Sequence, residues 1–362
     1  LHHGRVADEV FHRIRDVHPA TLHGPVTGTI GAAGTGRPVD AAWRRRVCDR
    51  DAMGMPDDRA PAPKIAVEPP CWRRDALAAA VEEGGGQVVP LHDATALVWA
   101  DPQAPELLPE HTLPTLDWVQ LPYAGIEPFI DLLDRDRTWT CGKGVYSAPV
   151  AEHVLALTLA AFHNLGPYSA ATSWSAPVGR NLRGQRVLIL GGGGITRDLL
   201  PLLAPFGTHN VVIRRSPAPL VGAQETTTLD HLHEQLAQAD VVVLALAVTP
   251  DTTHIIDSAA LQAMKPDAWL VNVARGAHVD TDALVAALTD GTIGGACLDV
   301  TEPEPLPDGH ALWGLDNCLI TPHVGNTPEM GLVLLAERVA ENTRRYHRGQ
   351  ELIGPVDLDL GY

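Results

Sequence analysis

Three residues in the last third of the chain could act together in one reaction. Arg275 lies in the sequence VNVARG, Glu304 in LDVTEPEP and His323 in TPH, and all three follow a glycine-rich turn. A cation can hold a carboxylate, an imidazole can donate or accept a proton near neutral pH, and a carboxylate can tune that imidazole. Together with a bound dinucleotide, these groups are what hydride transfer to or from a 2-hydroxy acid requires.

A glycine-rich turn predicts where the dinucleotide would bind. The apolar strand VLIL at 187–190 runs into GGGGIT at 191–196, and a helix is expected from Arg197. In such a turn the first glycine allows a tight bend, and the second lets the backbone approach the pyrophosphate at the helix N-terminus. Thr196 stands at the third position, where a β-branched side chain should push the helix and the strand slightly apart. The predicted cofactor contacts in this turn are Gly191, Gly193, Gly194 and Ile195.

The next expected strand ends at Arg214, where an acidic residue would bind the ribose 2′-hydroxyl of NAD. Arg215 and Ser216 follow it directly. An acid would repel a 2′-phosphate, whereas two guanidinium groups and a hydroxyl can bind one. The sequence therefore favours NADP(H) over NAD(H) as the cofactor, through Arg214 and Arg215. The alternative interpretation is that both are solvated surface arginines.

Two series of alternating strands and helices must position these residues. In the first series, short apolar segments are expected as strands at 64–67, 87–89, 96–99, 116–121 and 138–141. A helix is expected at 74–83, where a run of three glycines would end it. This pattern predicts a small α/β unit.

A long apolar helix at 149–165 separates the first series from the second. Strands of the second series are expected at 186–190, 211–214, 240–245, 268–273, 293–297 and 318–320. A helix at 281–289, stopped by Gly291, is one of the helical stretches between them. Six strands joined by helices match a doubly wound parallel sheet. A last helix at 328–348 is expected to cross back to the first unit, which would then contain segments from both ends of the series.

Composition and charge exclude several classes of partner. The formal net charge is −17, so the protein should repel nucleic acid phosphates and anionic lipids. No apolar run reaches the ~20 residues that a membrane helix needs, and no signal-peptide pattern is present. The five cysteines include no C-x-x-C pair, which predicts neither a metal site nor a disulfide framework. We expect a cytoplasmic protein without nucleic acid, membrane or metal ion as a partner.

Residues 1–60 differ in pattern from the rest of the chain. They contain the glycine-rich segment GTIGAAGTG and the basic run RRR, with no clear helical or strand period. We expect an N-terminal extension that is disordered, or an over-extended gene start. The alternative is a regulatory or targeting segment.

Several separate motifs between residues 64 and 362 resemble one enzyme family. They are WVQLPYAGIE at 118–127, the helix at 150–157, the glycine turn, LAVTPDT at 246–252 and the motifs around Arg275, Glu304 and His323. The spacing of 29 residues from Arg275 to Glu304 fits as well. On these residues the chain is similar to the D-isomer-specific 2-hydroxyacid dehydrogenases, which include glyoxylate/hydroxypyruvate reductases and phosphoglycerate dehydrogenases.

The resemblance implies a fold and a domain organisation. The expected architecture is α/β, with a Rossmann-type NAD(P)-binding domain at 149–325 inserted into a flavodoxin-like substrate domain at 61–148 and 326–362. A cleft between the two domains would hold the site. Family members are usually homodimers joined through their cofactor domains, so we expect a homodimer with the helix at 150–165 near the contact.

The resemblance also assigns roles to side chains. His323 would be the proton donor in reduction and the base in oxidation, Glu304 would hydrogen-bond its other ring nitrogen, and Arg275 would bind the substrate carboxylate in a bidentate manner. Glu302 competes with Glu304 for the carboxylate role, and the family spacing selects Glu304. The substrate carboxylate is also expected to meet the backbone N–H groups of Tyr123, Ala124 and Gly125. Further cofactor contacts are expected from Thr252 and Asp299.

The substrate expected from the sequence is a small, unphosphorylated 2-oxo acid such as glyoxylate or hydroxypyruvate. Family members that act on phosphoglycerate usually place an arginine just after the strand at 96–99, but here Ala100, Asp101 and Pro102 follow it. Asp101 would repel a phosphate. Three alternatives stay open: a phosphoglycerate dehydrogenase-type activity, formate oxidation, and a non-catalytic protein that senses dinucleotides. Formate oxidation pairs its histidine with glutamine, so Glu304 argues against it, and the complete set of three side chains argues for catalysis.

Overall fold

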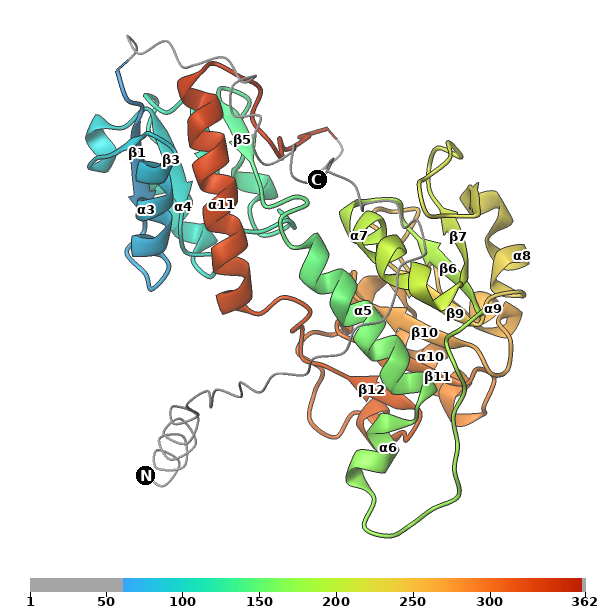
Figure 1. The fold of residues 1–362 in the computed structure, drawn as a ribbon. Helices are drawn as coiled ribbons and strands as arrows, with labels where there is room; N and C mark the ends of the chain where they lie inside the picture. Colours follow the sequence, from blue (N-terminus) through green and yellow to red (C-terminus); the bar gives the residue numbers. More distant parts are fainter. Residues whose placement is uncertain (1–60, 360–362) are drawn as a thin grey trace, which may run out of the picture. The chain divides into compact units, whose positions relative to one another are not determined.

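The computed structural model describes residues 61–359, which form two parallel β-sheets covered by helices (Figure 1). This architecture confirms the predicted α/β class. Residues 1–60, which the sequence predicts to be a disordered extension, and residues 360–362 lie outside the described residues. Within residues 61–359, no helix is both long enough and apolar enough to cross a membrane.

The first sheet has five parallel strands in the order β2-β1-β3-β4-β5. They are β1 (Lys64–Glu68), β2 (Gln87–Val88), β3 (Ala96–Trp99), β4 (Trp118–Gln120) and β5 (Thr138–Thr140). All five correspond to expected strands. The order is that of flavodoxin-like sheets, in which ligands bind beyond the carboxyl ends of the strands.

Both faces of the first sheet are covered. On one face lie α3 (Arg74–Glu83) and α11 (Pro328–His347), which run alongside each other in Figure 1 as a blue and a red helix. Their buried side chains form one core with those of β1 and β3. The short helix α4 (Leu108–His111) contributes to the core on the other face. The last long helix therefore returns to the sheet that the first strands build, as its position in the sequence predicts.

The second sheet has seven parallel strands in the order β12-β11-β10-β9-β6-β7-β8. They are β6 (Arg186–Leu190), β7 (His209–Ile213), β8 (Glu225–Thr227), β9 (Val241–Leu244), β10 (Trp269–Asn272), β11 (Gly295–Leu298) and β12 (Cys318–Ile320). The order is the doubly wound one, with a switch between β6 and β9. The expectation of six strands was wrong by one, because β8 is a half-buried edge strand whose sequence Glu-Thr-Thr has no apolar pattern.

Helices cover the second sheet as well. They are α5 (Ser147–Phe162), α6 (Leu165–Ala170), α7 (Gly194–Leu203), α8 (Leu232–Leu236), α9 (Ser258–Ala263) and α10 (Thr281–Thr289). Figure 1 shows α5 beside α7, and the two share a buried core with β6. The start of α7 at Gly194 corrects the expected start at Arg197, because the glycine turn itself supplies the first helical turn. α10 spans its expected range, and the Asp280 carboxylate caps it by accepting the Ala283 N–H.

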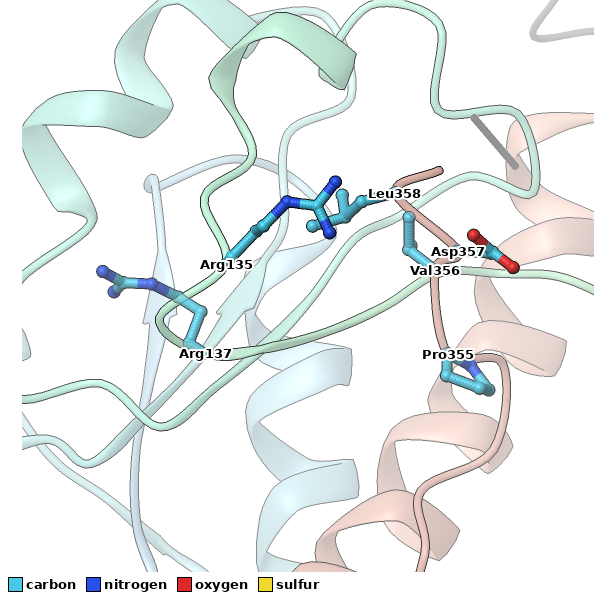
Figure 2. A pocket seen from close by; sticks show the side chains of 6 residues that line it. All are labelled: Arg135, Arg137, Pro355, Val356, Asp357 and Leu358. Atoms are coloured by element: carbon cyan, nitrogen blue, oxygen red, sulfur yellow. The ribbon is translucent and has the colours of Figure 1, made fainter. Parts of the chain in front are cut away.

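A pocket of about 470 Å³ lies where the C-terminal segment meets the loop before β5 (Figure 2). It is lined by Arg135, Arg137, Pro355, Val356, Asp357 and Leu358. Arg135 is paired with Asp359 at 2.6 Å, and Arg137 with Asp134 at 2.8 Å. The pocket contains none of the residues that the sequence predicts for catalysis or cofactor binding.

Candidate functional site

Two of the three predicted catalytic side chains form a direct pair. Nδ1 of His323, in the turn after β12, lies 2.7 Å from Oε1 of Glu304, in the loop after β11. The competing Glu302 instead contacts Nε2 of His254 at 3.1 Å. The side chains of His323 and Glu304 are 54% and 42% exposed, so both remain accessible to a ligand. The pair leaves Nε2 as the ring nitrogen of His323 that can meet a substrate oxygen.

The backbone of His323 is strained and is held by Asp299. Its φ of 53° lies in the left-handed region, which is costly for a residue with a side chain. The Asp299 carbonyl accepts the His323 N–H at 2.8 Å. The Asp299 carboxylate accepts the N–H groups of Val324 and Gly325, each at 2.9 Å, and the Thr321 hydroxyl at 2.6 Å. One buried carboxylate therefore fixes the whole turn that presents His323.

Asp299 is 3% exposed, and α5 supplies its remaining partner. Nε2 of His153 lies 3.3 Å from Oδ1 of Asp299 and 3.0 Å from Oγ1 of Thr321. Burial would raise the pKa of Asp299, but hydrogen bonds from His153, Thr321 and two backbone N–H groups lower it from 3.8 to about 2. The contacts described for Asp299 all hold this turn in place. The cofactor contact expected for Asp299 stays a prediction. The role of His153 was not predicted from the sequence.

Replacing Asp299 by asparagine is expected to cost about 2 kcal/mol of stability at neutral pH. The folded-state pKa of Asp299 is below its ordinary value, so its stabilisation is complete above about pH 4 and is lost as pH falls towards 2. The Asp299→Asn variant should therefore show a lower Tm at pH 7 and a smaller difference from wild type near pH 2–3. Thermal melts from pH 2 to pH 8 measure this. The control Asp267→Asn removes an exposed carboxylate that pairs with Arg180 and should change Tm little. Parallel stability curves for wild type and Asp299→Asn would contradict the expectation.

Arg275 lies in the loop after β10, and hydrogen bonds to its own carbonyl oxygen hold its backbone. That oxygen accepts a hydrogen bond from the Asn272 side-chain amide at 2.8 Å, and Nδ1 of His278 lies 3.0 Å from it. In the guanidinium, Nη1 donates to the Ala274 carbonyl at 2.8 Å and Nε donates to Oε1 of Glu127 at 3.2 Å. Arg275 is 41% exposed, so its Nη2 side can still bind a carboxylate from a ligand.

The turn predicted to bind the substrate carboxylate lies next to Arg275. A Cβ on Gly125 would collide with Nη2 of Arg275 and with the Glu127 carboxylate, so a side chain there would displace these two flexible groups. Tyr123, two residues earlier, is 39% exposed. Burial raises its pKa, and the charge of Arg73 opposes that effect. Glu127 lies in the motif WVQLPYAGIE and is not among the predicted site residues; the signal that could have found it is a carboxylate two residues after the glycine.

The glycine turn has the shape of a cradle for a phosphate group. Gly191 has a φ of 109°, and a Cβ there would collide with the Ala245 carbonyl. Gly193 precedes α7 and has open space around its Cβ position. A Cβ on Gly194 would collide with the Ser147 hydroxyl, so the glycine lets α5 pack closely against the start of α7. The turn therefore leaves the first N–H groups of a ten-residue helix available to an anion.

Thr196 does not disturb this turn in the way that the sequence suggested. It is fully buried, and its hydroxyl donates to the Gly191 carbonyl at 2.7 Å. The hydroxyl thus replaces the close packing of a third glycine with a hydrogen bond across the turn. Threonine can therefore replace the usual third glycine, because its hydroxyl forms this hydrogen bond.

Arg214 lies beside the glycine turn at the end of β7. It is half-buried, and a Cβ on Gly192 would come within 2.9 Å of its Cδ. Arg215 next to it is exposed. Thr252, the other predicted cofactor contact, holds its own loop: its hydroxyl donates to the Ala247 carbonyl and accepts the Thr249 N–H, both at 2.8 Å. The guanidinium groups of Arg214 and Arg215 thus both follow β7, at the same end of the sheet as the glycine turn.

In the structure, His323 contacts Glu304, and Arg275 lies beside the turn at 123–125. The glycine turn and Arg214 form a second group at the ends of β6 and β7. Within the described part of the chain, no three His, Cys, Asp or Glu side chains are grouped to hold a metal ion.

A known family matches the part of the chain that contains these residues. The family model described as "D-isomer specific 2-hydroxyacid dehydrogenase, NAD binding domain" matches residues 155–325. A protein of Corynebacterium melassecola, described as an uncharacterized protein in the proB 3′ region, is 39% identical over 311 residues. That match covers 83% of this chain and 100% of the Corynebacterium protein.

Relatives with named activities match over a shorter length. The glyoxylate reductase of Thermococcus onnurineus is 37% identical over 173 residues, which are 48% of this chain and 52% of that enzyme. The chain thus aligns with about half the length of that reductase. Among solved structures, a D-isomer specific 2-hydroxyacid dehydrogenase from Xanthobacter autotrophicus Py2, in complex with NADPH and MES, has a TM-score of 0.71 and 28% identity. It covers 83% of this chain and 100% of its own.

Proposed function

We propose a reaction for this chain on the premise that it belongs to the D-isomer specific 2-hydroxyacid dehydrogenase family. The reaction is the reduction of a small 2-oxo acid to the D-2-hydroxy acid, and its reverse, with glyoxylate and hydroxypyruvate as the favoured substrates. When bound, NAD(P)H supplies the hydride that reaches the carbonyl carbon. The observation that carries the proposal is the 2.7 Å contact between His323 and Glu304. The name of the Thermococcus glyoxylate reductase supports the substrate class.

His323 would move the proton in this reaction. As negative charge develops on the carbonyl oxygen, Nε2 of a protonated His323 donates to it, while Nδ1–H remains bonded to Glu304. The Glu304 carboxylate stabilises the charged imidazolium before transfer and keeps the ring oriented. In oxidation, the neutral ring accepts the hydroxyl proton at the same nitrogen. Asp299 would act through the backbone, by holding the left-handed turn at His323.

Arg275 would bind the C1 carboxylate and polarise the neighbouring carbonyl. The guanidinium is oriented by Ala274 and Glu127, which leaves the Nη2 side beside Gly125 for the substrate. The backbone N–H groups at 123–125 would complete the carboxylate site. This arrangement binds one end of the substrate and leaves the reacting carbon free to meet the hydride donor.

NADP(H) is the proposed cofactor. The cradle at Gly191 fits a pyrophosphate, and Arg214 and Arg215 at the end of β7 fit a 2′-phosphate. The Xanthobacter structure is a complex with NADPH, which supports the proposal. The variant Arg214→Ala/Arg215→Ala is expected to lower kcat/KM for NADPH about 30-fold and to change kcat/KM for NADH less than about threefold. The exposed Arg183→Ala is the control. A wild-type enzyme that uses NADH equally well would contradict the proposal.

The test of the activity is the loss of NADPH absorbance with glyoxylate, hydroxypyruvate, pyruvate and phosphohydroxypyruvate. We expect turnover with the first two. Silence with every 2-oxo acid, together with tight binding of the dinucleotide, would contradict an enzymatic role and would favour a sensor of dinucleotides.

Three broader features are also proposed. The substrate domain would comprise residues 61–148 and 326–362, and the cofactor domain residues 149–325; the separate hydrophobic cores of the two sheets support this division. We propose a homodimer in which α5 lies near the contact, which sedimentation equilibrium would test. The cytoplasmic location expected from the sequence stays a proposal.

A further inference from the structure

Arg73 is a buried guanidinium with unsatisfied donors. It is 3% exposed, and neither Nε nor Nη1 has a hydrogen-bond partner. Its neighbour Trp72 stacks near it, with the ring centroid 5.7 Å from the guanidinium carbon. No carboxylate of the described residues forms an ion pair with it. Such a group needs an explanation, because an arginine cannot lose its proton and a buried unpaired charge is strongly destabilising.

Local stability does not account for this arginine. Arg73 directly precedes α3, where the helix dipole disfavours a positive charge. The next residue, Arg74, is more exposed, and its Nε donates to the Val67 carbonyl at 3.1 Å. Of the two consecutive arginines, only Arg73 has buried donors without a hydrogen-bond partner. A bound anion would supply acceptors for the unpaired donors of Arg73 and would compensate its charge.

Arg73 lies at the edge of the first sheet where a ligand is expected. Glu68 at the end of β1 pairs with Trp99 at the end of β3, and β4 is parallel to both, so the loops after these strands leave from the same edge. These loops carry Arg73, Asp101 and the turn at 123–125. The carboxyl ends of parallel strands are the usual position of ligands in such sheets.

Two tyrosines place Arg73 close to the proposed substrate turn. The charge of Arg73 acts on Tyr123 of that turn, where Asp101 acts in the opposite direction. Burial raises the pKa of Tyr146 to about 12. The charge of Arg73 and a hydrogen bond from Arg73 act in the opposite direction and lower that pKa. The Tyr146 hydroxyl also donates to the Pro122 carbonyl at 2.5 Å. Arg73 therefore belongs to the same group of side chains as the turn that would hold the substrate carboxylate.

We propose that Arg73 determines substrate specificity by binding a second carboxylate, at the end of the 2-oxo acid remote from Arg275. This inference rests on the proposed reaction, the reduction of a 2-oxo acid, and replaces glyoxylate and hydroxypyruvate as the favoured substrates by short 2-oxo dicarboxylic acids. A carboxylate is preferred to a phosphate because Asp101 acts on the same region, and its charge would repel a phosphate dianion more strongly. A neutral substituent would leave the buried charge uncompensated. The residues after β3, Ala100 and Asp101, supply no cation, whereas the loop after β1 supplies Arg73.

The experiment compares two 2-oxo acids with equal numbers of carbon atoms. 2-Oxoglutarate has a distal carboxylate, and 2-oxovalerate has a methyl group in its place. We expect wild type to favour 2-oxoglutarate by at least about tenfold in kcat/KM, and Arg73→Gln to lower this ratio by at least about tenfold. Arg74→Gln is the matched control and should keep the wild-type ratio. A wild-type enzyme that favours 2-oxovalerate, or equal ratios in wild type and Arg73→Gln, would overturn the inference.

A binding measurement covers the case in which Arg73→Gln is too unstable for kinetics. Glutarate, which has both carboxylates but no reducible carbonyl, should raise the Tm of wild type and Arg74→Gln, and should raise that of Arg73→Lys less. Equal shifts in Arg73→Lys and Arg74→Gln would count against the role of Arg73. A preference of wild type for phosphohydroxypyruvate over 2-oxoglutarate would also overturn the choice of a carboxylate. Turnover of glyoxylate without any preference for a dicarboxylate defeats only this inference, whereas silence with every 2-oxo acid defeats the proposed function itself.

Discussion

The His323→Gln variant is expected to reduce glyoxylate with a kcat about 10³-fold below that of wild type, within the range for removal of a general acid. Glutamine can still hydrogen-bond a substrate oxygen, but it cannot deliver a proton. Binding of NADPH should change less than about threefold, because the glycine turn belongs to the β6–α7 connection and His323 to the turn after β12. Stopped-flow kinetics give kcat, and fluorescence titration gives the Kd of NADPH.

A second histidine–glutamate pair provides a matched control for this prediction. His254 contacts Glu302 at 3.1 Å, is similarly exposed, and also has a left-handed backbone, with a φ of 50°. His254→Gln removes a comparable contact and keeps a comparable left-handed backbone, so it should retain kcat within about threefold if only His323 handles the proton. Turnover near wild type in His323→Gln, with cofactor binding intact, would remove the proposed mechanism. Equal losses in both variants would indicate a general effect on these loops.

The sequence was sufficient for the fold because the buried strands are short apolar runs with helices between them. Val241–Leu244 is an example: all four residues are buried, and a parallel strand covered on both faces requires this pattern. The edge strand β8 escaped prediction because half-burial places no apolar demand on its residues. The pairing of Glu304 rather than Glu302 with His323 was reached through family spacing, since the two residues are chemically identical.

Contacts between segments distant in sequence could not be predicted in the same way. His153 and Asp299 are 146 residues apart, and nothing in their local sequences indicates that α5 would reach the turn carrying His323. Arg73 was also missed, because a pair of arginines at a helix start has the same sequence pattern whether one of them is buried or both are solvated. Residue type restricts the chemistry that a position can perform, but burial and unsatisfied hydrogen bonds are properties of the packed molecule.

The second large effect is expected for Arg275→Lys, which should lower kcat/KM for glyoxylate about 10²-fold. Lysine keeps the positive charge but lacks the planar fork that can bond both oxygens of a carboxylate. It also cannot contact Ala274 and Glu127 while presenting further donors to a substrate, as the guanidinium does through Nη1 and Nε. The loss should appear mainly in KM if Arg275 only binds the carboxylate, and in kcat as well if it also polarises the carbonyl.

Two companion variants separate the position of Arg275 from its charge. Gly125→Ala adds a Cβ where Nη2 of Arg275 now lies, and the flexible ends of Arg275 and Glu127 can move aside without disturbing the core. That variant should stay folded but show a KM for glyoxylate raised about tenfold, because the guanidinium is displaced. Arg180 also donates to a carboxylate and to a backbone carbonyl, both of Asp267, so Arg180→Lys changes a comparable set of contacts elsewhere and should leave KM unaltered. If Gly125→Ala and Arg275→Lys both retained the wild-type KM, the C1 carboxylate would have to bind elsewhere, because the position and the fork of Arg275 would each have been altered without consequence.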